Sequence, residues 1–176
     1  MDFDSYERWL EENGNREEKQ AIAIVSKILK YHRLNISEVK FFPRKVIKRG
    51  RERVEFDLIM AYKLKRFKVE RLIGVELKES DFQKAVHQAI VRKEFVHYMY
   101  IAVREPLLRF ELPSLLLMTY YGIGLLVWND KTALLIVPSI MTTPDYIRLE
   151  QLIGKLIQAQ IETMKQNKTL KDWLKV

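Results

Sequence analysis

The sequence predicts an α/β protein in which a mixed central β-sheet is flanked by helices. Segments whose apolar residues recur three and four positions apart, typical of amphipathic helices, alternate with short segments rich in β-branched and aromatic residues, typical of strands. No Gly/Ser-rich or Pro-rich linker and no internal repeat divides the 176 residues. The expected element order is α-β-β-β-α-β-α-β-β-α, which fits a three-layer sandwich.

The first half of the chain is expected to carry two helices and three strands. Pro43 indicates an edge or irregular first strand, because proline cannot donate a hydrogen bond to a neighbouring strand. A turn is expected at Lys48-Arg49-Gly50, between the first two strands. The expected helices are 5–12 and Arg16–His32, and the expected strands are 37–47, 54–60 and 69–78.

The second half is expected to alternate helices with strands. Ser80 can cap the helix after the third strand, because its hydroxyl can accept a hydrogen bond from a free backbone N–H. Gly122 suits the end of the next helix, and Thr143-Pro144 suits the start of the last one. The expected helices are 81–93, 112–121 and 143–165, and the expected strands are 97–103, 125–128 and 133–137.

The last helix is expected to form a C-terminal extension, residues 144–176, beside a main domain of residues 1–143. Its apolar residues form a wide stripe that can cover the sheet or pair with a second copy of the chain in a homodimer. The stripe consists of Leu149, Leu152, Ile153, Leu156 and Ile157. Trp173 and Leu174 would dock in the same way, within the monomer or across a dimer.

The composition excludes several classes of protein. Because there is no cysteine, the chain has no disulfide, no cysteine–zinc site and no thiol nucleophile. A hydrophobic content of 48% is enough for a sizeable core, which excludes global disorder. The acidic first residues predict no secretory signal, and the apolar stretch Leu112–Trp128 is broken by Pro113, Gly122 and Gly124, so no membrane span is expected. We expect a cytoplasmic protein.

The charge is positive and concentrated in one region. The formal net charge is +8, and the excess lies between Lys40 and Arg71, where twelve basic residues face four acidic ones. Such a region suits a nucleic acid, because each neutralised phosphate releases counterions. The same residues could also merely solvate an exposed hairpin, and charge alone favours neither interpretation. The residues expected to contact nucleic acid are Arg44, Lys45, Lys48, Arg49, Arg51, Arg53 and, on the helix 81–93, Lys84.

Chemistry is expected where Asp57 lies beside Glu76-Leu77-Lys78. Residues two apart in a strand point to the same face, so Glu76 and Lys78 project together while Leu77 faces the opposite way, into the core. Asp57 lies on the preceding strand, where hairpin pairing can bring it next to Glu76. Two converging carboxylates suit Mg²⁺, and a neighbouring ammonium can stabilise charge on a phosphate. The alternative is a cross-strand ion pair in a solvated sheet.

The run Glu55-Phe56-Asp57, followed by Glu76-Leu77-Lys78 and a helix, resembles the PD-(D/E)xK nuclease superfamily. That superfamily includes restriction endonucleases, archaeal Holliday-junction resolvases and RecB-type nuclease domains, and the resemblance covers about residues 15–138. It implies a restriction-endonuclease-like fold, with Asp57, Glu76 and the Leu77 carbonyl as ligands of Mg²⁺ or Mn²⁺. It also implies that Lys78 assists the attacking water. Phe56 stands where the family often has proline.

Two further positions match the superfamily. Many members place a glutamate on the first helix near the metal, and Glu18 is the preferred candidate because it shares a helix face with buried residues. Glu17 is the alternative, and both could simply be solvated acids of a first helical turn. Members also carry a polar residue on the helix after the motif, where Gln88 shares a face with Lys84 and could reach a phosphate or order the lysine.

The leading functional hypothesis is a Mg²⁺- or Mn²⁺-dependent DNA endonuclease. DNA is preferred on the resemblance alone, and RNA is also compatible with the same residues. A second hypothesis is a catalytically inactive nucleic-acid-binding or assembly protein that keeps the nuclease fold. A third is a basic structural domain in which the match to the motif is accidental.

Overall fold

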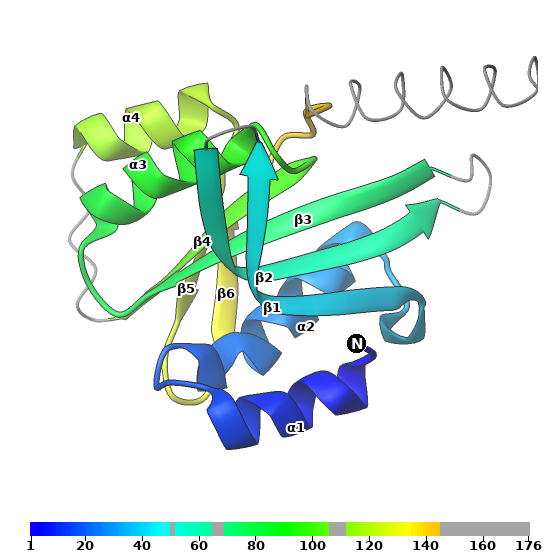
Figure 1. The fold of residues 1–176 in the computed structure, drawn as a ribbon. Coiled ribbons are helices and arrows are strands. Elements are labelled where there is room, and N and C mark those ends of the chain that lie inside the picture. Colours follow the sequence, from blue (N-terminus) through cyan, green and yellow to red (C-terminus); the bar gives the residue numbers. More distant parts are fainter. Residues whose placement is uncertain (50–51, 65–68, 106–111, 145–176) are drawn as a thin grey trace, which may run out of the picture.

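The computed structural model describes residues 1–49, 52–64, 69–105 and 112–144 (Figure 1). The described helices are α1 (Phe3–Asn13), α2 (Ala21–His32), α3 (Phe82–Lys93) and α4 (Leu112–Tyr120), with short 3₁₀ turns at Glu18–Gln20 and Ile36–Glu38. The described strands are β1 (Val39–Arg49), β2 (Glu52–Leu64), β3 (Val69–Lys78), β4 (Tyr98–Arg104), β5 (Gly124–Trp128) and β6 (Ala133–Val137).

The six strands form one mixed sheet in the order β1-β2-β3-β4-β5-β6. The first three strands are antiparallel, β3, β4 and β5 are parallel, and β6 returns antiparallel to β5. The two parallel steps are each connected through a helix, α3 and then α4, because parallel neighbours need a crossover. The predicted mixed α/β class is confirmed.

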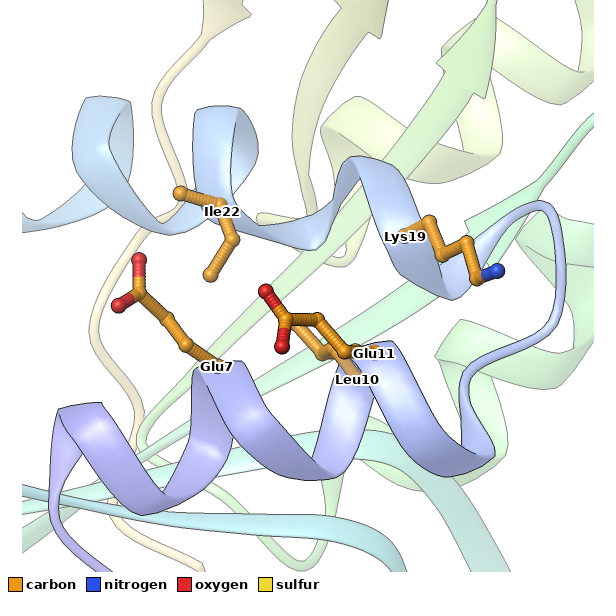
Figure 2. Close-up of a pocket in the computed structure, with 5 residues that line it drawn as sticks. All are labelled: Glu7, Leu10, Glu11, Lys19 and Ile22. Atoms are coloured by element: carbon orange, nitrogen blue, oxygen red, sulfur yellow. The ribbon is translucent and has the colours of Figure 1, made fainter.

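Helices cover both faces of the sheet, in an arrangement compatible with a three-layer sandwich. Figure 1 shows α1 and α2 on one face and α3 and α4 on the other. A cavity of about 450 Å³ lies between the two helices of the first face and is lined by Glu7, Leu10, Glu11, Lys19 and Ile22. Figure 2 shows Glu7 and Glu11 directed into this cavity from α1. Asp57, Glu76 and Lys78 are not among its lining residues.

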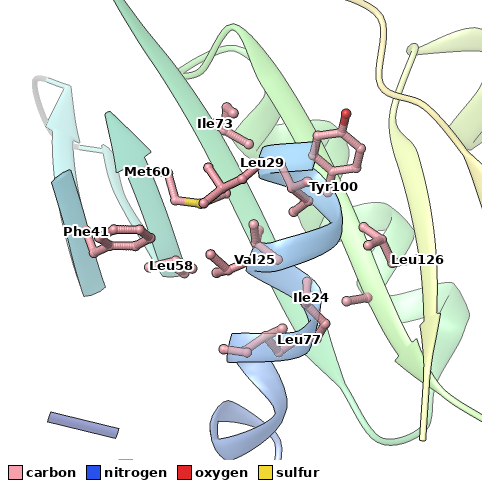
Figure 3. Packing of buried hydrophobic residues seen from close by; sticks show 14 of the residues in the cluster. Ile24, Val25, Leu29, Phe41, Leu58, Met60, Ile73, Leu77, Tyr100 and Leu126 are labelled. Atoms are coloured by element: carbon pink, nitrogen blue, oxygen red, sulfur yellow. The ribbon is translucent and has the colours of Figure 1, made fainter. Parts of the chain in front are cut away.

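The core is divided by the sheet into two clusters. On the α2 face, Val25 and Leu29 pack against strand residues such as Leu58 (Figure 3). On the other face, α3 contributes Ala85, Val86 and Ala89 to a second cluster. Burial on both faces explains why β4 reads as an almost continuous apolar run and not as an alternating one. Within the described part of the chain, no helix combines the length and apolarity that crossing a membrane requires.

Two helix starts differ from the expectation. The second helix begins at Ala21 and not at Arg16. Ahead of it, Asn15 and Glu18 bond each other reciprocally, Asn15 N to Glu18 Oε2 at 2.8 Å and Glu18 N to Asn15 Oδ1 at 2.9 Å. These bonds close a 3₁₀ turn ahead of the helix. The cap of α3 is Asp81 and not Ser80, since the Asp81 carboxylate accepts from Lys84 N at 3.0 Å.

Some expectations lie partly outside the described residues. The expected turn includes Gly50, and the expected last helix and its apolar stripe fall in residues 145–165. Trp173 and Leu174 also lie outside the described part.

The β1–β2 hairpin bends sharply at Arg44 and Asp57. Arg44 adopts a positive φ of 44°, a conformation that side chains other than glycine rarely take. On β2, Phe56 packs in the α3-face cluster whereas Leu58, two residues on, packs in the α2-face cluster, so the usual alternation of faces shifts at Asp57. Figure 1 shows both strands turning at this point. The irregular edge strand indicated by Pro43 is confirmed, and its break falls one residue later.

Two histidines, the buried His97 and the half-buried His32, are held in the neutral form. His97 Nδ1 accepts a hydrogen bond from Leu72 N at 3.1 Å, a bond that a protonated nitrogen could not accept. His32 Nε2 lies 2.9 Å from the hydroxyl of the buried Tyr100. Burial lowers the pKa of both histidines to about 4, and for His97 the positive charges of Arg71 and Lys93 lower it further.

We predict that stability falls as the pH drops from about 6.5 to about 4, because only the unfolded chain binds protons at His32 and His97 across that interval. Above this window the two histidines contribute no pH dependence. Urea unfolding between pH 8 and pH 4 measures the slope. His32→Gln should reduce the slope relative to wild type, whereas Ser26→Ala, at an exposed position of the same helix that carries no titratable group, should leave it unchanged. Equal slopes in the two variants would contradict the assignment.

Candidate active site

The predicted motif lies where β2 separates from β3. Within the described strands, pairing between them ends with Leu58 opposite Val75, so Asp57 and Glu76 are the first residues beyond the ladder. There the Leu77 N–H donates to Asp57 Oδ2 at 2.7 Å. The Asp57 carboxylate thus takes the place of the backbone carbonyl that a continuing strand would offer. This bond fixes Asp57 beside the Glu76-Leu77-Lys78 segment, as the pairing argument predicted.

The residue before Asp57 anchors the bend in the core. Phe56 is fully buried and lies against Gly74, where an added Cβ would come within 2.8 Å of the Phe56 ring and 2.9 Å of Met99 Sδ. Because Gly74 has no side chain, the Phe56 ring can close over β3 on the α3 face. Packing of Phe56 in that cluster therefore supports the position of Asp57.

Glu76 is a carboxylate inside the protein. It is fully buried and points to the same face as Gly74, toward α3. Two cations flank it: Lys78 Nζ lies 2.9 Å from Oε1, and Arg92 Nη1 lies 2.6 Å from Oε2. Arg92 also donates from Nε to the carbonyl oxygen of Glu55 at 2.6 Å. A single arginine thereby connects α3, β2 and the motif strand.

Burial and the neighbouring charges act in opposite directions on the charged forms of Glu76 and Lys78. Burial raises the pKa of Glu76 to about 7, and the neighbouring Asp57 adds to this rise against the opposing effects of Arg92 and Lys78. For Lys78, burial acts against the charged form, but Glu76, Asp57 and Glu17 together outweigh it and raise the Lys78 pKa. The four charged groups therefore hold one another in place.

The donor set of the site fits a divalent cation that prefers oxygen ligands. Each oxygen of the buried Glu76 carboxylate is paired with one cation, Oε1 with Lys78 and Oε2 with Arg92. In a strand, the N–H and C=O of one residue point to the same side, so the Leu77 carbonyl is directed to the side of Asp57. Asp57, Glu76 and this carbonyl are ligand types that Mg²⁺ takes, completed by water.

A third carboxylate does not join this pair directly. Within the ranges that the structure describes, no three His, Asp or Glu side chains gather as a metal-binding group. Glu18 is buried, as expected, but it is held by Arg44, through Nε at 2.8 Å and Nη2 at 2.6 Å. Glu17 accepts a hydrogen bond from Glu79 N at 2.7 Å and lies close enough to raise the Lys78 pKa. Both alternatives for the helix carboxylate thus border the site, each already bonded to a neighbour.

The residues expected to bind nucleic acid have different surroundings. Arg44 is engaged by Glu18 and lies over the Trp9 ring, 5.2 Å from its centre. Lys45 and Arg53 are exposed beyond the bend of the hairpin, and Lys84 is exposed on α3. Lys48 and Arg49 are the last residues of β1, and Arg51 lies outside the described residues.

The α3 helix supplies a residue that sequence reasoning missed. Gln88, the predicted polar residue, is half-buried, and its Oε1 has no hydrogen-bond partner among the described residues. Arg92 lies one helical turn further on and makes the contacts with Glu76 and the Glu55 carbonyl. The sequence could have indicated Arg92, because it lies four residues after Gln88 and residues i and i+4 share one face of a helix.

Comparison with known proteins identifies no family. The sequence matches no described protein family and no curated protein. Among solved structures, the chain is similar to a protein of unknown function from Silicibacter pomeroyi, with 18% sequence identity and a TM-score of 0.48. The similarity covers 85% of this chain and 89% of that one.

We predict that Arg92→Met lowers the free energy of unfolding by about 2–4 kcal/mol, because it leaves the buried Glu76 carboxylate with one cation fewer. In a Glu76→Gln background the same substitution should cost far less, since no buried charge then needs compensation. Denaturant unfolding of the four proteins of this cycle measures the coupling. Arg53→Met, at an exposed position on β2, is the control and should change stability by less than about 0.5 kcal/mol. Additive effects of Arg92→Met and Glu76→Gln would contradict the pairing.

Proposed function

We propose that this protein is a metal-dependent nuclease that hydrolyses phosphodiester bonds of DNA on a restriction-endonuclease-like fold. The observation that carries the proposal is the position of Asp57, bonded to Leu77 N at the point where β2 leaves β3, directly beside the buried Glu76. On this proposal Asp57, Glu76 and Lys78, the residues that resemble the PD-(D/E)xK pattern, act together at this end of the β2–β3 ladder.

Asp57, Glu76 and the Leu77 carbonyl would hold Mg²⁺ or Mn²⁺. Bound there, the ion would supply positive charge against the scissile phosphate. The chain's own residues prepare the position: Leu77 N–H orients Asp57, and burial against α3 keeps Glu76 from turning toward solvent. Such orientation matters because phosphodiester hydrolysis depends on an in-line attack, which a loosely held ligand set would not enforce.

Lys78 and Arg92 have separate roles in this proposal. Lys78 is partly exposed and reaches Glu76 Oε1 from the strand itself, so its ammonium is available to face a phosphate or to order the attacking water. Arg92 is less exposed, is ion-paired with Glu76 and donates a hydrogen bond to the Glu55 carbonyl, which makes it a positioning residue. Through Glu55 it links the carboxylate to the strand that carries Asp57.

The positive charge beyond the bend supports DNA as the partner. Lys45 and Arg53 are exposed on the part of the β1–β2 hairpin that extends beyond the β2–β3 ladder. Asp57 lies between this part of the hairpin and the ladder. A duplex attracted to this hairpin would lie next to the carboxylate pair. Glu18 and Glu17 border the same region, where Glu18 fixes Arg44 at the bend.

A second candidate function is an inactive nucleic-acid-binding protein that keeps this fold. One observation favours it: each Glu76 oxygen is already paired with a cation, and Glu18 is paired with Arg44. If these ion pairs persist when DNA binds, the carboxylates would serve structure alone and the exposed basic residues would still bind phosphate. The two candidate functions differ in whether the protein cleaves DNA when a divalent cation is present.

We predict that the wild-type protein cleaves at least one DNA substrate, out of duplex, single strand, flap and four-way junction, only when Mg²⁺ or Mn²⁺ is present. Asp57→Asn and Lys78→Gln should lower the cleavage rate by about 100-fold or more, because each removes a group that acts on the reacting atoms. Glu55→Gln is the matched control: it removes a carboxylate on the same strand that is exposed, and its rate should stay within about 2-fold of wild type.

Cleavage by Asp57→Asn at the rate of Glu55→Gln would overturn the nuclease proposal. Absence of cleavage on every substrate, together with salt-sensitive DNA binding that Asp57→Asn leaves intact, would establish the inactive binding protein instead.

A further inference from the structure

The helix α4 exposes apolar residues that a solvated helix would not carry. Its sequence from Leu112 to Tyr120 contains no charged residue. Ser114 and Met118 face the protein and are buried, whereas Leu112, Leu116 and Tyr120 are 68%, 62% and 83% exposed. These three residues are spaced four apart and therefore form one stripe along the helix. A helix that is apolar all round is expected to be covered on its outer side as well.

The apolar surface continues past the end of the helix. Gly122 accepts a backbone hydrogen bond from Ile140 N at 2.9 Å, and the Ile140 side chain packs against this glycine. Ile140 and the adjacent Met141 are 63% and 47% exposed. We call the combined surface the α4 face, formed by Leu112, Leu116, Leu117, Tyr120, Ile140 and Met141.

The α4 face lacks the charge that would suit DNA. The whole stretch Leu112–Trp128 contains no charged residue, although the chain carries a net charge of +8. Contiguous apolar surface of this kind marks a contact with another apolar element. Figure 1 shows α4 at the periphery of the fold, beside α3, so that its outer side is accessible to such an element.

The chain itself contains a segment of matching length and character. Residues 145–176 follow directly on Pro144, and the stripe from Leu149 to Ile157 contains five apolar residues at helical spacing. That stripe covers nine residues, as does α4, and at 1.5 Å per residue each would be about 13 Å long as a helix. Two apolar helical stripes of equal length can pack ridges into grooves.

The connection between the two surfaces is short. Seven residues, 142–148, join Met141 on the α4 face to Leu149 at the start of the stripe. Fully extended they span at most about 25 Å, so the stripe cannot begin far from the face. So short a connection gives the stripe a high effective concentration at its own α4 face, which favours this contact over one with a second copy. We propose that the C-terminal segment of the same chain docks on the α4 face through Leu149–Ile157.

Cross-linking tests this docking without background, because the natural chain has no cysteine. A Leu116→Cys, Ile153→Cys double variant is treated with a short bismaleimide at low micromolar concentration, and the products are separated and mapped by mass spectrometry. We expect a cross-link within one chain. Lys30→Cys with Ile153→Cys is the matched control, since Lys30 is exposed on α2, across the sheet from α4, and it should give little product.

Three results of this test would overturn the proposal. A cross-link between two chains would show that a second copy covers the α4 face. Absence of the Leu116–Ile153 product, or a yield equal to that of the Lys30 control, would show that the segment docks elsewhere.

Hydrogen exchange of full-length variants gives a second readout that does not depend on cross-linker geometry. Leu116→Glu places a charge on the α4 face and should raise deuterium uptake in residues 149–157 several-fold. Tyr31→Glu, at an exposed aromatic residue on α2, should leave that uptake at the wild-type level. Equal uptake in wild type and Leu116→Glu would contradict intramolecular docking, whatever the outcome of the nuclease assays.

Discussion

The hydrogen bond from Leu77 N–H to the Asp57 carboxylate is the interaction on which the candidate site depends. It forms because β2 pairs with β3 only from Leu58 onward, which would otherwise leave the backbone of the motif strand without a partner beside Asp57. A backbone donor that must be satisfied thus holds a carboxylate at a fixed place. The bend that creates this opening is anchored on one side by Phe56 against Gly74 and on the other by Arg44 against Glu18.

The buried Glu76 ties stability to function in the same region. A carboxylate in the core is unfavourable unless cations compensate it, and here the compensation comes from Lys78 on the same strand and Arg92 on α3. Each Glu76 oxygen is paired with one of these two cations, so a bound divalent cation would have to share or replace one of the pairs.

The sequence predicted those features of the site that follow from the alternation of side chains along a strand. Alternation along β3 predicted that Glu76 and Lys78 share a face and that Leu77 enters the core, and hairpin pairing predicted Asp57 beside them. The left-handed conformation of Arg44 gives no sequence signal, since such a φ is expected at glycine and not at arginine. The Arg92 contact with Glu76 crosses from helix to strand between residues sixteen apart, and the Arg44 contact with Glu18 joins residues 26 apart. No local pattern encodes these tertiary contacts.

The central claim is that Asp57 and Glu76 together form a site for a divalent cation, and calorimetric titration with Mn²⁺ tests it most directly. The wild-type protein and Glu55→Gln should bind the ion with equal affinity, and Asp57→Asn should bind it at least about 10-fold more weakly, because a ligand carboxylate becomes an amide. Indistinguishable titrations of Asp57→Asn and Glu55→Gln, or no binding by the wild-type protein, would contradict the account.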